Sequence, residues 1–111
     1  MGYVKHCKEK VEKQGLRCTF SGMYNCYIID PVHIIRRSYS KALRDDKRNI
    51  IPGDREIHNI FDNGRFADVL RRYPWRCKAI LHRMRDMDLY YFRRFCRRND
   101  IEIDQNYCVI I

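Results

Sequence analysis

Residues 30–62 read DPVHIIRRSYSKALRDDKRNIIPGDREIHNIFD, and this stretch decides the fold that the sequence predicts. His33 lies in an apolar, β-favouring run at residues 27–35, which bends or meets a sheet edge at Pro31 because proline has no amide donor. Asn49 begins a second, shorter apolar run. The stretch therefore predicts two strands joined by a long loop.

A turn and a helix are expected after the second strand. The loop at 36–48 is strongly charged and has a length that is usual for functional loops. Pro-Gly at 52–53 is typical of a turn, and Asp54 is a residue that caps a helix expected over 55–63. Gly64 is expected to end that helix.

Histidine and carboxylate side chains gather on these elements. Asp30 and His33 are three residues apart and would face opposite sides of a straight strand, whereas a bulge would let them converge. On the predicted helix, His58 and Asp62 are four residues apart and share one face.

Four motifs in this order resemble the HNH nuclease family, in the branch whose motifs read C-x-x-(S/T)-G, (E/D)-x-x-H-I, N-x-(I/L) and H-x-x-F-D-x-G. The matching residues are Cys18-Thr19-Phe20-Ser21-Gly22, Asp30-Pro31-Val32-His33-Ile34, Asn49-Ile50-Ile51 and His58-Asn59-Ile60-Phe61-Asp62-Asn63-Gly64. The resemblance implies an α+β fold with a ββα-metal core, or His-Me finger, and added N- and C-terminal helices. We expect a single HNH nuclease-like domain over 1–111, with the core at about 17–65 and a helical C-terminal extension at about 66–100.

The resemblance also implies a metal-dependent endonuclease that hydrolyses DNA phosphodiester bonds and leaves a 5′-phosphate and a 3′-hydroxyl. His33 would be the general base that activates water, and His58 a metal ligand. Asn49 would either steady the imidazole of His33, by bonding backbone near the first strand, or ligate the metal. We expect one divalent cation, with Mg²⁺ the first choice and Mn²⁺, Ni²⁺ or Zn²⁺ also able to serve.

One position departs from the family pattern. The family commonly has a carboxylate or a histidine directly before the base, and here that residue is Val32. Asp30 is our first choice to replace it as a metal ligand, and Asp62 is the second. Arg36 and Arg37 follow the base and either clamp the scissile phosphate or face solvent.

Composition points to a polyanionic partner. The 111 residues carry 23 Lys and Arg against 14 Asp and Glu, a net charge of +9. Such a balance fits double-stranded DNA, although a solvated basic surface has the same composition. With no signal peptide at the start and no run long enough to cross a bilayer, we expect a cytoplasmic protein without a membrane partner or a small-molecule cofactor.

Six cysteines, at 7, 18, 26, 77, 96 and 108, form no C-x-x-C pair. We therefore expect reduced thiols, several of them in helix cores, and no second, structural zinc of the kind that many HNH proteins carry. Outside the core, helices are expected over 3–14, 65–73 and 74–87, with another after Asp88. The tail at 101–111 is expected to add a strand to the small sheet.

Two other functions fit the sequence. The first is a non-catalytic nucleic-acid-binding or regulatory module on a degenerate HNH fold, which Val32 favours. The second is a zinc-stabilised interaction domain that uses Cys18, Cys26 and His33. The arginines at 93–98 are either a DNA contact or a solvated surface.

Overall fold

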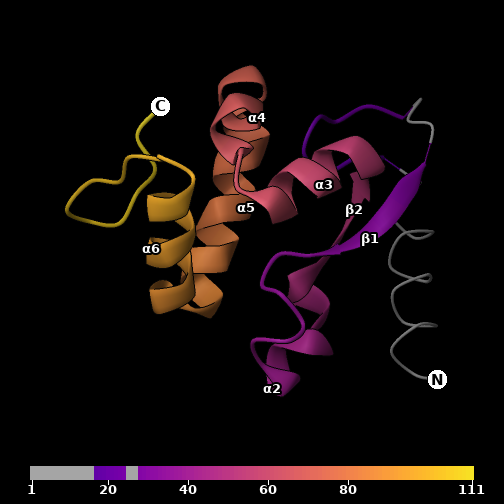
Figure 1. Ribbon diagram of the computed structural model, residues 1–111, viewed down its shortest axis with the longest axis horizontal. Helices are drawn as coiled ribbons and strands as arrows, with labels where there is room; N and C mark the ends of the chain where they lie inside the picture. Colours follow the sequence, from indigo (N-terminus) through magenta and orange to yellow (C-terminus); the bar gives the residue numbers. More distant parts are fainter. Residues whose placement is uncertain (1–16, 25–27) are drawn as a thin grey trace. The chain divides into compact units, whose positions relative to one another are not determined.

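The computed structural model describes residues 17–24 and 28–111 (Figure 1). The chain forms two compact units, Met1–His58 and Asn59–Ile111, and the boundary falls inside one helix. The helix expected over 3–14 lies outside the described residues, and the single domain over 1–111 stays a prediction.

The first unit contains a two-stranded antiparallel sheet. Strand β1 (Ile29–His33) pairs with β2 (Ile50–Asp54), and β2 leads directly into helix α3 (Arg55–Asn63). The order strand, strand, helix is therefore as expected. With five α-helices and this sheet among the described residues, the α+β class is confirmed.

β1 contains no bulge, so Asp30 and His33 alternate to opposite faces of the strand. Each β1 residue has one partner in β2, from Ile29 opposite Asp54 to His33 opposite Ile50. Pro31 lies opposite Pro52. Neither proline has an N–H, and antiparallel strands alternate between hydrogen-bonded and non-hydrogen-bonded pairs, so the two prolines fit the latter position without breaking the strand.

The turn expected at 52–53 is also wrong, because both residues lie within β2. A Cβ atom on Gly53 would come within 2.8 Å of Val32 Cγ2 and 2.9 Å of Phe20 Cε2. The glycine therefore permits a close approach between the sheet and the side chain of Phe20, rather than a reversal of the chain.

The loop between the strands is not irregular throughout. It contains helix α2 (Lys41–Arg44) and a 3₁₀ helix (Lys47–Asn49). The side chain of Ser40 accepts a hydrogen bond from Leu43 N at 3.3 Å, and that of Asp46 accepts one from Arg48 N at 2.9 Å. These two caps start the helices, and Asn49 ends the second one.

Residues 17–24 lie along the outer edge of β2. Thr19 N donates to Pro52 O at 2.8 Å, and Asp54 N donates to Cys18 Sγ at 3.3 Å.

The second unit is helical, with α4 (Phe66–Arg72), α5 (Pro74–Met87) and α6 (Leu89–Arg98). The rings of Phe66 and Phe95 lie 5.0 Å and 4.9 Å from the ring of Phe61, measured between centroids, and form its aromatic core. Cys77 and Cys96 are buried, as expected for cysteines in helix cores.

The ends of these helices follow local signals. Pro74 opens α5, and the side chain of Asp88 caps α6 by accepting a hydrogen bond from Tyr91 N at 2.9 Å. The tail, however, adds no strand to the β1–β2 sheet and forms an isolated bridge between Ile103 and Val109. In the described part of the chain, no helix combines the length and apolar character needed to cross a bilayer.

Candidate functional site

Asn49 is fully buried, and its side chain makes three hydrogen bonds to backbone atoms. Its Oδ1 accepts from Ile35 N at 2.6 Å, and its Nδ2 donates to Ile35 O and Leu43 O, both at 2.9 Å. The carboxamide thus bonds backbone beside the first strand, the first of the two arrangements considered for it. Because both amide atoms are engaged, the arrangement favours a positioning role over metal ligation.

His33 lies at the end of β1 and is half-buried, with its Nε2 3.0 Å from the carbonyl oxygen of Arg44. A carbonyl can only accept, so Nε2 carries the proton and Nδ1 is the nitrogen able to take one up. Burial lowers the pKa of His33 more than the Arg44 bond raises it, and the charges of Arg37 and His58 lower it further. The imidazole is therefore neutral at pH 7, the state that a general base needs.

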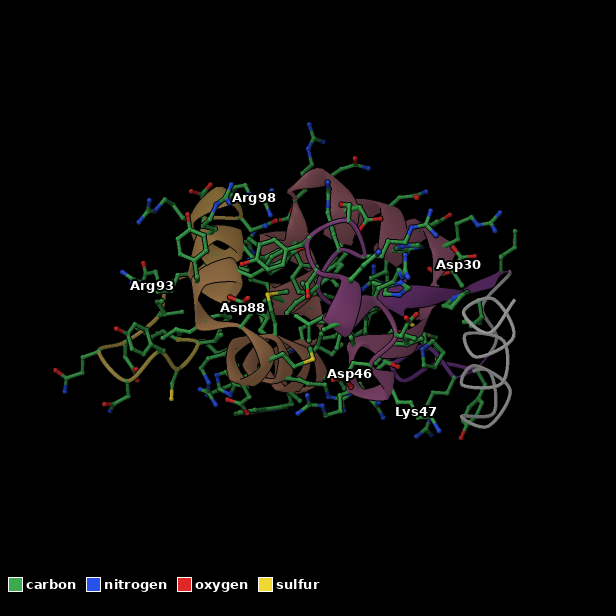
Figure 2. The ribbon with its side chains drawn as sticks, turned by 90° about the horizontal axis from the view of Figure 1, so that it is seen from below. Asp30, Asp46, Lys47, Asp88, Arg93 and Arg98 are labelled. Atoms are coloured by element: carbon green, nitrogen blue, oxygen red, sulfur yellow. The ribbon has the colours of Figure 1, made fainter. Side chains whose placement is uncertain are left out.

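The side chains of His58 on α3 and Asp30 on β1 contact each other. His58 Nδ1 lies 3.1 Å from Asp30 Oδ2, and Arg55 holds the same carboxylate in two bonds of 2.9 and 3.1 Å. The bond from Arg55 holds the pKa of Asp30 below its ordinary value, while burial opposes this effect and His58 adds to it. Asp30, which lies on β1 in Figure 2, is thus an ionised carboxylate with an imidazole beside it.

The spacing of this pair suits two ligands of one cation. Neighbouring ligands of an octahedral ion with bonds of about 2.1 Å are about 3.0 Å apart, close to the 3.1 Å between His58 Nδ1 and Asp30 Oδ2. Within residues 17–24 and 28–111, no group of three or more His, Cys, Asp or Glu side chains is arranged to hold a metal. The 3.1 Å separation is also that of a hydrogen bond between His58 and Asp30, so a cation at this pair stays a prediction.

The remaining predicted residues lie at different places. Val32 is fully buried and packs in the core. Arg36 and Arg37 are exposed in the turn that follows β1, and Arg37 is close enough for its charge to act on His33. Asp62 lies on α3 beyond the unit boundary, so its role stays a prediction.

Two residues of this site were not expected from the sequence. Arg55 precedes His58 by three residues and shares its helix face, a spacing that the sequence already contains. No sequence pattern indicates the contact of the Arg44 carbonyl with His33, because only the path of the loop brings that backbone atom to the imidazole. Cys18 is buried, and Cys26 lies outside the described residues, so the zinc alternative stays a prediction.

No protein-family model, no curated protein and no solved structure matches this chain. The likeness to HNH nucleases therefore rests on the four sequence motifs. His33, Asn49 and His58 belong to the first unit, and the charge of His58 acts on the pKa of His33.

Proposed function

We propose that this chain is a metal-dependent endonuclease of the HNH type that hydrolyses phosphodiester bonds in double-stranded DNA. His33 is the general base, Asn49 positions it, and His58 with Asp30 holds one divalent cation, Mg²⁺ first. The observation that carries the proposal is the buried Asn49, which ties the backbone after His33 to the loop that bonds the imidazole.

The chain supplies a base in the right protonation state. Neutral His33 accepts the proton of the attacking water at Nδ1, while the Arg44 carbonyl keeps Nε2 protonated and the ring in one orientation. A bound cation would supply the positive charge that stabilises the phosphate oxyanion and the leaving oxygen. Arg36 or Arg37, exposed beside the base, contacts the scissile phosphate.

A plasmid-nicking assay with Mg²⁺ or Mn²⁺ tests the base. We expect His33→Ala to cut about 10² to 10⁴ times more slowly than the wild type, the usual contribution of general base catalysis. His82→Ala is the matched control, because His82 lies on α5 in the second unit and has no part in the proposed chemistry. Equal cutting by the wild type and His33→Ala would remove His33 from the reaction.

A second candidate function is a non-catalytic nucleic-acid-binding or regulatory module. Two observations favour it: Val32 is buried where the family has a ligand, and no described group of three or more ligands is arranged for a metal. Calorimetric titration with Mn²⁺ separates the two functions. The nuclease proposal expects metal uptake that His58→Ala abolishes, whereas DNA binding without such uptake would establish the module instead.

A further inference from the structure

Helix α6 divides into a buried face and an arginine face. The buried residues are Tyr91, Phe92, Phe95 and Cys96. The α6 arginine face consists of four exposed residues, Arg93, Arg94, Arg97 and Arg98. At about 100° per residue these four side chains, with the exposed Tyr90 among them, cover about 140° of the helix circumference. Figure 2 shows Arg93 and Arg98 on α6, at different points along the helix.

Among the residues that the structure describes, the α6 arginine face has no carboxylate partner. The helix contains no acidic residue, and none of its four arginines forms an ion pair with any residue in 17–24 or 28–111. Arg93 and Arg97, and likewise Arg94 and Arg98, are four residues apart, so their like charges repel. The helix dipole favours only the two C-terminal arginines, so it does not offset the repulsion at Arg93 and Arg94.

Aromatic rings lie under two of the guanidinium groups. Arg94 Cζ is 5.6 Å from the centre of the Tyr90 ring, and Arg93 Cζ is 5.6 Å from that of Tyr107. The carbonyl of Tyr107 accepts a bond from Arg85 Nη1 at 3.2 Å, which holds the tail beside the helix. Stacking restricts both arginine side chains and leaves their N–H groups able to donate to an anion.

We propose that the α6 arginine face is a second DNA-binding surface, carried by the second unit, which contacts the phosphate backbone of a duplex. The choice of duplex DNA rests on the proposed function. Arginine's planar fork matches phosphate geometry, and unpaired basic side chains release counterions when they neutralise phosphates. An anionic membrane fits less well, because the apolar face of α6 is already buried and none is left to insert.

The test measures binding of a fluorescent DNA duplex of about 30 base pairs by anisotropy, across a salt series. EDTA replaces divalent metal, so binding is read without cleavage. The test variant changes Arg93, Arg94, Arg97 and Arg98 to Gln. The matched control changes four other exposed arginines of the same unit to Gln, so that both lose the same charge: Arg65, Arg71, Arg72 and Arg76.

For the α6 variant, we expect at least a tenfold weaker affinity at about 0.1 M salt. Its salt slope should be smaller by about 3.6, at about 0.9 for each of four phosphate contacts. The control should lower the slope by less than about 1. Replacing the same four α6 arginines with Lys should restore most of the affinity. Should the Gln variant fail to fold by circular dichroism, single substitutions, each expected to lower the slope by about 0.9, replace it.

Equal losses in the α6 variant and the control would overturn the proposal, because net charge alone would then explain binding. It would also be overturned if the α6 variant lost only its binding to phosphatidylcholine–phosphatidylglycerol vesicles. If the protein cuts no plasmid but its DNA binding depends on the α6 arginines, the nuclease proposal is rejected and the α6 surface stands. If the wild type cuts plasmid and the α6 variant binds DNA as tightly as the wild type, the nuclease proposal stands and the α6 surface is rejected.

Discussion

Among the described residues, each unit of the molecule buries one asparagine, and both side chains bond to backbone atoms, with different consequences. Asn49 in the first unit is 0% exposed and Asn99 in the second is 4% exposed. Asn49 makes three bonds to the backbone, as described above. Asn99 accepts from Phe66 N at 2.8 Å and donates to Phe95 O at 2.9 Å.

The difference lies in what each amide holds. Asn99 joins the start of α4 to the end of α6, so it only fastens two helices together. Asn49 bonds Leu43 O, and the next residue, Arg44, provides the carbonyl that orients His33. The same buried amide is thus a packing device in one unit and a positioning device beside a candidate base in the other.

Asn49→Asp should have the largest effect. The introduced carboxylate would face two backbone carbonyls, Ile35 O and Leu43 O, that now receive N–H donors. We expect a loss of unfolding free energy on the order of 3–5 kcal/mol, because two buried acceptors lose their donors and a charge is buried. Urea unfolding measures it, and a loss below about 1 kcal/mol would show that the amide is not a clamp.

Asn99→Asp is the matched substitution in the second unit. Here the introduced carboxylate faces one carbonyl, Phe95 O, and keeps its acceptor bond to Phe66 N. We expect a smaller loss of about 2–3 kcal/mol in urea unfolding. At a temperature where the variant is folded, its cutting of plasmid should equal that of the wild type; a loss as great as that of Asn49→Asp would erase the contrast between the two amides.

His82 makes the second unit sensitive to acid. Its Nε2 accepts a hydrogen bond from Val109 N at 3.0 Å, which requires a neutral ring. Burial lowers the pKa of His82, and the charges of Arg85 and Lys78 lower it further. Two carboxylates near the ring oppose this effect, those of Asp86 and Asp104.

Since the folded pKa lies below the ordinary value of about 6.5, the unfolded chain takes up the proton first. The stability that the neutral ring contributes is complete above about pH 6.5 and is lost as pH falls toward the folded pKa. We expect His82→Gln to cost about 1 kcal/mol at pH 8, the net value of one hydrogen bond, and to reduce the acid loss. Urea unfolding between about pH 5 and pH 8 measures both; an unchanged acid slope would assign the loss elsewhere, for example to His33, whose pKa is also lowered.

Asp100→Gly should have the smallest effect, and a favourable one. Asp100 follows α6 with a φ of 54°, and Ile101 N bonds Cys96 O at 2.9 Å, the pattern of a left-handed helix cap. Gly64 has the same place after α3, with a φ of 83°. We expect Asp100→Gly to raise the free energy of unfolding by about 0.5–1 kcal/mol, and Gly64→Ala to lower it by a similar amount. Calorimetry measures both, and a loss for Asp100→Gly would mean that the carboxylate has a role of its own.

The sequence by itself determined the order of the elements and most helix ends, because those signals act within a few residues. Pro74 opens α5 and Gly64 follows α3 through their backbone conformations, and Asp88 caps α6 with its own side chain. The motif also located His33, Asn49 and His58, although their roles stay predictions.

Only the tertiary structure decided contacts between residues distant in the chain. Gly53 has the local signature of a turn, yet Phe20 and Val32 press against it inside a strand. Likewise the loop path brings the Arg44 carbonyl to His33, and sheet register brings Arg55 to Asp30. The physical reason is that a local propensity of about a kcal/mol yields to packing and buried hydrogen bonds, whose partners no short stretch of sequence specifies.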